Sequence, residues 1–151
     1  MELKDALESA VGHQRNGRPD QAETIYRRIL AEVSDHPDTL HLLGVALHQQ
    51  GKTAEGLEIL DRAIGANPAA ASYHNSMGVV RRELGRGQEA VESIRRATEL
   101  DPDNADAFFN LGNALRSLAH PDDAEAAYKH SLALRPQNAD VLNNLGTLLT
   151  E

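Results

Sequence analysis

Residues 40–51 read LHLLGVALHQQG, and both glycines of this stretch belong to series that run along the chain. The central glycine recurs every 34 residues, at Gly44, Gly78, Gly112 and Gly146. The closing glycine keeps the same step, at Gly17, Gly51 and Gly85, with Ala119 in the next position. A period of this length indicates stacked supersecondary units rather than one globular core. Function in such arrays usually lies on a surface that several units build together.

Each period reads as two amphipathic helices with a tight turn between them. In residues 37–70, leucines recur at helical spacing up to Gly51, whose place is typical of a helix C-terminus. We expect Thr53 to cap the second helix and Pro68 to follow its end. The sequence thus predicts an all-α fold of about nine helices. The predicted repeats are a divergent one at 3–36, three at 37–70, 71–104 and 105–138, and a half-repeat at 139–151.

The mid-helix glycines need a physical reason, because a glycine there costs about 1 kcal/mol relative to alanine. We expect that the missing side chain allows the second helix of each pair to pack closely. Small residues recur on that second helix in the matching position, at Ala22, Gly56, Ala90 and Ala124.

Composition excludes several classes of partner. Lysine and arginine number 15 against 23 aspartates and glutamates, a formal net charge of −8. Nucleic acid and anionic membranes are therefore not expected as partners, because both bind basic surfaces. The lack of cysteine excludes disulfides and thiolate metal sites and fits a reducing compartment. The chain opens with an amphipathic segment rather than a signal peptide, and we expect a soluble protein of the cytoplasm.

The sequence carries no catalytic or metal-binding signature. His41 and His48 lie seven residues apart on one predicted helix, too far for paired metal ligands without a third group. No H-E-x-x-H, G-x-S-x-G or phosphate-loop motif accompanies them. We therefore expect no enzyme, no cofactor and no metal site.

Together these features resemble the tetratricopeptide repeat over the whole chain. The resemblance rests on a large apolar residue before the mid-helix glycine, the turn glycine, the small residue of the second helix and the closing proline. It implies a right-handed superhelical solenoid of antiparallel helix pairs, whose first helices line a concave groove that binds a peptide or a partner protein. The residues that the resemblance places in this groove are His41, Val45, His48, Asn75, Val79, Arg82, Phe109, Asn110, Asn113, Arg116 and Asn144.

Two kinds of groove chemistry follow from the resemblance. Similar repeats of protein O-N-acetylglucosamine transferases carry an asparagine two residues before the mid-helix glycine, which binds peptide backbone amides. Asn110 and Asn144 hold that position here, whereas Glu8, Leu42 and Ser76 hold it in the earlier repeats. The alternative is that these asparagines are ordinary polar residues of an exposed helix face. The carboxylate clamp of chaperone-binding arrays is absent, since Leu7, Val11 and Leu42 hold its first positions.

Two functions remain open. The chain is an interaction module in its own right, or it is the substrate-recruitment fragment of a larger transferase similar to bacterial O-N-acetylglucosamine transferases. In both cases its role is binding. The predicted last helix also carries an apolar set wider than one neighbouring helix can cover, which favours self-association through the half-repeat. That set is Val141, Leu142, Leu145, Leu148 and Leu149.

Overall fold

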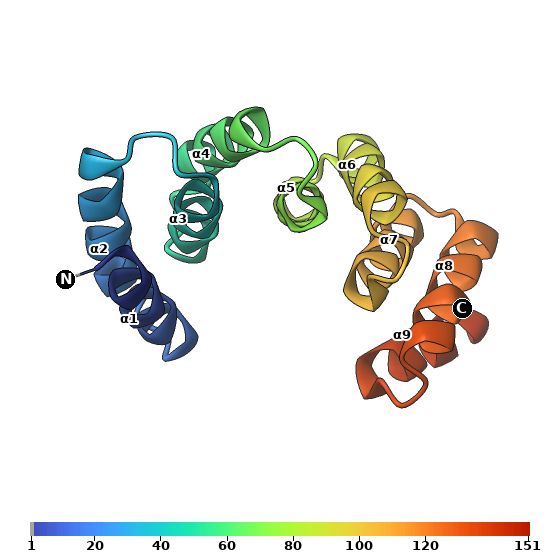
Figure 1. Cartoon of the computed structure of the whole chain (residues 1–151). Helices are drawn as coiled ribbons and strands as arrows, with labels where there is room; N and C mark the ends of the chain where they lie inside the picture. The colour runs from blue at the N-terminus through green and yellow to red at the C-terminus, as the bar shows by residue number, and fades with distance from the viewer. Residues whose placement is uncertain (1) are drawn as a thin grey trace. The chain divides into compact units, whose positions relative to one another are not determined.

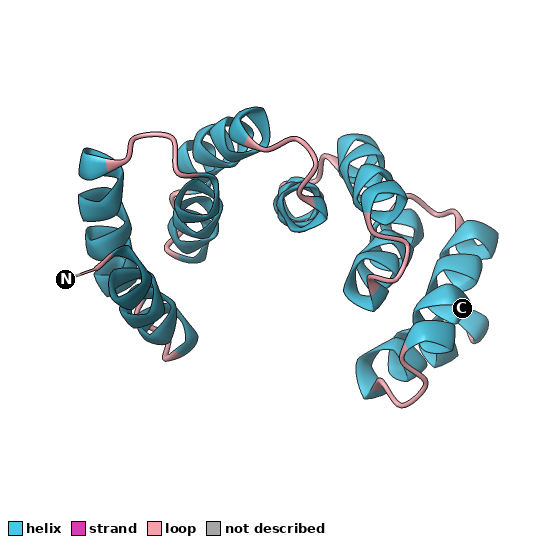
Figure 2. Ribbon diagram, in the orientation of Figure 1, coloured by secondary structure: helices cyan, strands magenta, loops and turns pink. Residues whose placement is uncertain are grey.

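The computed structural model describes residues 2–151, which fold into nine α-helices without a strand (Figure 2). The all-α fold class and the number of helices expected from the sequence are thus confirmed for these residues. The helices are α1 (Leu3–Arg15), α2 (Pro19–Glu32), α3 (Pro37–Gln49), α4 (Thr53–Ala66), α5 (Ala71–Glu83), α6 (Gly87–Leu100), α7 (Ala105–Ser117), α8 (Pro121–Leu134) and α9 (Ala139–Leu149). None of these helices is long and apolar enough to cross a membrane.

The chain divides into two compact units. The boundary between them along the sequence lies within α5, between Tyr73 and His74. In the first unit α1 packs against α2 and α3 packs against α4, as Figure 1 shows by their labels. Its core contains Tyr26, Leu40, Leu43, Leu47 and Tyr73. In the second unit α7 packs against α6 and α8, and α9 packs against α8. Its core contains Val91, Ile94, Leu111, Leu115, Tyr128 and Val141.

The first helices of successive pairs begin 34 residues apart, at Leu3, Pro37, Ala71, Ala105 and Ala139. These starts coincide with the starts of the predicted repeats. The compact units follow a different division, because their boundary lies inside the predicted repeat 71–104. We keep the repeat boundaries as an interpretation of the sequence.

The mid-helix glycines make room for a large side chain of the second helix. A Cβ atom added at Gly44 would lie 2.6 Å from Leu60 Cγ, and one at Gly112 would lie 2.5 Å from the ring of Tyr128. At Gly78 the added atom would collide with Ile94 Cγ1 and would lie 3.1 Å from the carbonyl oxygen of Ala90. The close packing expected from the sequence is therefore present, but its main element is the bulky residue four positions after the small one.

Gly146 differs from the other mid-helix glycines, because an added Cβ would meet no atom within 4 Å. On the same helix, Val141 and Leu148 are buried, whereas Leu142 is 49% and Leu149 61% exposed. As the sequence led us to expect, α8 covers only part of the apolar set of α9.

The turns between paired helices use a left-handed residue. Gly51 has a φ of 81°, and the N–H groups of Gly51 and Lys52 donate to the carbonyls of His48 and Leu47, both at 2.9 Å. This pair of bonds is a Schellman motif, which satisfies the last carbonyls of α3. Thr53 does not cap α4 as expected, since the N-cap is Lys52 and Thr53 is the first residue of the helix.

Ala119 is the one non-glycine residue among residues 2–151 with a positive φ, 59°. It makes the same turn bonds, which include the N–H of His120 donating to Leu115 O at 3.0 Å. An L-residue in this region is strained by about 1–2 kcal/mol. We expect Ala119→Gly to raise the free energy of unfolding by about 1 kcal/mol or less. Relief of the strain stabilises the folded chain, and the extra conformational entropy that glycine gives the unfolded chain offsets part of this gain. Urea titration measures the change, and Gly51→Ala, the reverse substitution at an equivalent turn, should lower stability by a similar amount. Equal midpoints for Ala119→Gly and the parent would contradict the strain.

Candidate functional site

The residues expected to line a groove lie on the first helices of both units and are partly exposed without exception. In the first unit they are His41, Val45 and His48, all on α3. In the second unit they are Asn75, Val79 and Arg82 on α5, Phe109, Asn110, Asn113 and Arg116 on α7, and Asn144 on α9.

Asparagine amides bridge neighbouring first helices in the second unit. Asn110 Nδ2 donates to Asn75 Oδ1 at 3.1 Å, which joins α7 to α5. Asn144 Nδ2 donates to Asn113 Oδ1 at 2.9 Å, which joins α9 to α7. The two asparagines predicted to form a ladder are therefore each paired with another asparagine of the preceding first helix.

Tyr128 forms a hydrogen bond to one of these asparagine pairs. Its hydroxyl donates to Asn113 Oδ1 at 2.7 Å, and burial raises its pKa, so the hydroxyl stays protonated as a donor. In the first unit the equivalent tyrosine, Tyr26, donates instead to Gln14 Oε1 at 2.8 Å. Sequence reasoning missed this support, although the two tyrosines lie 102 residues apart, three whole periods.

A pocket of about 380 Å³ opens beside Asn113 and Asn144 in the second unit. It is lined by Arg82, Asn113, Arg116, Ser117, Asn144 and Glu151. Four of these were expected to line the groove, whereas Ser117 and Glu151 were not. Asn75 and Asn110 lie outside the lining, as do Val79 and Phe109, and the Phe109 ring packs against Tyr128 with centroids 6.2 Å apart.

The two arginines of the pocket differ in their partners. Arg116 binds the Glu151 carboxylate through Nε, 3.1 Å from Oε1, and through Nη2. The Nε atom of Arg82 is buried and has no hydrogen-bond partner in residues 2–151. Leaving a buried donor without a partner costs free energy.

The histidines on α3 have partners within the first unit. The His41 ring stacks on Tyr73 with centroids 4.6 Å apart, and burial lowers its pKa against the opposing charge of Asp38. His48 Nδ1 lies 3.0 Å from Thr53 Oγ1. In the described part of the chain, no group of three or more histidines, cysteines or acidic residues is placed to hold a metal ion.

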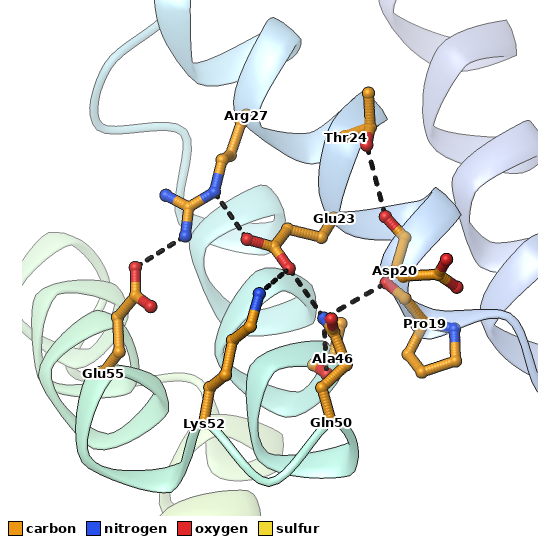
Figure 3. Close-up of polar contacts among 9 residues, drawn as sticks. All are labelled: Pro19, Asp20, Glu23, Thr24, Arg27, Ala46, Gln50, Lys52 and Glu55. Atoms are coloured by element: carbon orange, nitrogen blue, oxygen red, sulfur yellow. Dashed lines mark hydrogen bonds and ion pairs between the residues drawn. The ribbon is translucent and has the colours of Figure 1, made fainter.

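A polar network joins α2 to α4 in the first unit, and sequence reasoning missed it (Figure 3). Glu23 Oε1 accepts from Arg27 Nε at 2.8 Å, and its Oε2 accepts from Gln50 at 2.7 Å and Lys52 at 3.0 Å. Arg27 also donates to Glu55 Oε1 at 2.6 Å. The i,i+4 spacing of Glu23 and Arg27 was the one signal for it in the sequence.

Two family models match the chain, and both are described as tetratricopeptide repeat. They cover residues 14–78 and 68–137. Residues 14–137 are therefore built from tetratricopeptide repeats, as their periodic residues led us to expect.

Solved structures show the same fold. A crystal structure of MamA is 21% identical with a TM-score of 0.82 and covers 99% of this chain and 84% of that chain. PilF of Pseudomonas aeruginosa is 22% identical with a TM-score of 0.91 and covers 97% and 67%. The tetratricopeptide domain of Arabidopsis OM64 is 25% identical with a TM-score of 0.73 and covers 76% and 94%. A search of curated proteins gave no match.

Proposed function

We propose that this chain is a non-catalytic module that binds an extended peptide segment of a partner protein along the first helices of its second unit. The observation that carries the proposal is the pair of amide bridges, Asn75 with Asn110 and Asn113 with Asn144. Both bridges lie on partly exposed residues of a tetratricopeptide array. Such arrays use surfaces that several repeats share.

The bridges leave hydrogen-bonding groups for a ligand. An asparagine side chain has two donor hydrogens and an acceptor oxygen. Asn113 uses its oxygen for Tyr128 and Asn144, so its two N–H donors remain. Asn110 uses a donor hydrogen for Asn75, so its oxygen remains. Donors and acceptors in this mixture suit a peptide backbone, which presents N–H and C=O groups whatever its sequence.

We expect Asn110→Ala combined with Asn144→Ala to weaken peptide binding about tenfold or more, because a net hydrogen bond contributes about 0.5–1.5 kcal/mol. The ligand is a blocked peptide selected from a random display library, and calorimetry measures its affinity. Asn143→Ala is the matched control, since Asn143 is an exposed neighbour on the same helix. Circular dichroism checks that both variants keep their helices. Unchanged affinity in the double variant would return these asparagines to ordinary polar residues of an exposed face.

Three finer expectations stay predictions from the sequence. These are a role as the recruitment fragment of a larger transferase, self-association through α9, and a location in the cytoplasm. The exposed Leu142 and Leu149 keep a face of α9 open to a second copy.

A further inference from the structure

The pocket beside Asn113 and Asn144 has a local charge opposite to that of the chain. Its ionisable residues are Arg82, Arg116 and Glu151, two cations and one anion. The chain as a whole carries a formal net charge of −8. A concave site with a net positive charge attracts a ligand of the opposite sign.

The two arginines occupy one repeated position, four residues after the mid-helix glycines Gly78 and Gly112. Gln14 and His48 hold the equivalent positions in the first unit. Only the second unit therefore presents guanidinium groups on this face of its first helices. Guanidinium groups match the planar geometry of a carboxylate better than an ammonium group does.

Glu151 shows which chemical group fits the pocket. Its carboxylate binds both Nε and Nη2 of Arg116. This ion pair is open to water, since the Arg116 side chain is 31% and the Glu151 side chain 49% exposed. Exposed pairs contribute little to stability, so a competing carboxylate can displace Glu151. Arg82 has no such partner at its buried Nε.

We propose that this pocket is a carboxylate subsite, in which the side chain of a glutamate or aspartate in the bound peptide pairs with Arg82 and replaces Glu151 at Arg116. Asn113 and Asn144 then hold the peptide backbone next to the acidic residue. The site differs from the chaperone clamp considered above, whose first positions are apolar in this chain. The assignment rests on the proposed peptide binding and names the chemistry of its ligand.

The test uses a pentapeptide with one central glutamate and blocked ends, titrated into the labelled chain and followed by NMR. We expect shifts of the Nε–H signals of Arg82 and Arg116 and of the side-chain amides of Asn113 and Asn144. The same peptide with glutamine should bind at least tenfold more weakly. A glutamine peptide with a free C-terminal carboxylate should also bind more weakly, and if it binds as tightly as the glutamate peptide, the side-chain assignment is wrong.

Two variants change the pocket in opposite directions. Arg82→Gln should weaken binding of the glutamate peptide at least tenfold, whereas Glu151→Gln should strengthen it about threefold or more by removing the competing carboxylate. Arg96→Gln and Glu99→Gln are the matched controls, because this exposed pair lies on α6 outside the pocket and each change alters the net charge equally.

If Arg82→Gln disturbs folding, Glu151→Gln still decides the test. Glu151 is an exposed residue, so its substitution is not expected to affect the fold. Unchanged affinity in Glu151→Gln would overturn the subsite. Equal binding of the glutamate and glutamine peptides, or no binding of either, would also overturn it. Backbone capture is judged separately by the asparagine double variant.

Discussion

Replacing Gly78 with leucine is expected to lower the free energy of unfolding by about 1–3 kcal/mol, because it overpacks the contact between α5 and α6. Even a single Cβ atom there would collide with Ile94 and would approach the Ala90 carbonyl oxygen to 3.1 Å. The Ile94 contact involves Cγ1, a branch atom next to Cβ rather than the end of the side chain, and the other contact is a backbone atom. The backbone oxygen cannot move without displacing α6, so rotating the Ile94 side chain alone cannot relieve the whole cost.

Gly146→Ala is the matched control for this substitution, since it lies at the same position of the period. An added Cβ there meets nothing within 4 Å, so the helix propensity of alanine should raise stability by up to about 1 kcal/mol. Urea titrations of both variants and the parent measure the two effects. Amide hydrogen exchange in α5 and α6 locates the first effect, because the units of a repeat array can open separately. A parental midpoint for Gly78→Leu, or destabilisation by Gly146→Ala, would contradict this account of the glycines.

The helices could be predicted because the signals that define them are local and recur. A left-handed turn residue imposes a local backbone requirement, and a mid-helix glycine marks a close contact with a side chain of the next helix in the same repeat. Repetition at 34 residues then separates these requirements from chance. Ala119 shows the limit of the rule, since it adopts the left-handed turn without being glycine.

The contacts of the candidate site could be predicted only in part. The 34-residue period placed Asn110 and Asn144 on the first helices of their pairs, where the structure has them. Their hydrogen-bond partners, however, depend on the offset between neighbouring repeats. Asn110 bonds a residue 35 positions earlier and Asn144 one 31 positions earlier, so no single period describes both contacts. The place of Glu151 in the pocket could not be predicted from the apolar pattern, because it depends on how far the Arg116 and Glu151 side chains extend toward each other.

The Glu23 network is a non-periodic feature of the first unit that the repeat pattern could not reveal. Its equivalents one and two periods on are Leu57 and Val91, and only Glu125, three periods on, is again acidic. Glu125 makes one ion pair, with Lys129 at 2.6 Å, whereas three side chains donate to Glu23. The carboxylate of Glu23 thus joins α2 to the segment between α3 and α4, and this tie has no counterpart at Glu125.

Acid should therefore weaken the first unit through Glu23 in particular. Burial alone would raise the pKa of Glu23, but hydrogen bonds from Arg27, Gln50 and Lys52 outweigh it and lower the pKa from 4.5 to about 2. A carboxyl whose pKa is lower in the folded chain stabilises that chain above the unfolded pKa. This stabilisation is lost as the pH falls from about 5 towards 2. The shift corresponds to about 3 kcal/mol, which solvent around the half-exposed Arg27 and Lys52 reduces to about 1–2 kcal/mol.

We expect Glu23→Gln to be less stable than the parent by about 1–2 kcal/mol at pH 7. This difference should shrink to about 0.5 kcal/mol or less at pH 2.5, because most of the stabilisation from the ionised carboxyl is lost once the pH lies well below its unfolded pKa. Urea titrations at several pH values measure this difference, and hydrogen exchange in α2 assigns it to the first unit. Glu125→Gln serves as the control at the equivalent position of the period, and its difference from the parent should stay within about 0.5 kcal/mol at every pH, as for other exposed ion pairs. A Glu23→Gln variant whose deficit is the same at pH 7 and pH 2.5 would show that the charge of Glu23 does not hold α2 to α4. The tie would then come from packing and from the Arg27–Glu55 pair, and the acid sensitivity of the first unit would have to arise at other carboxylates.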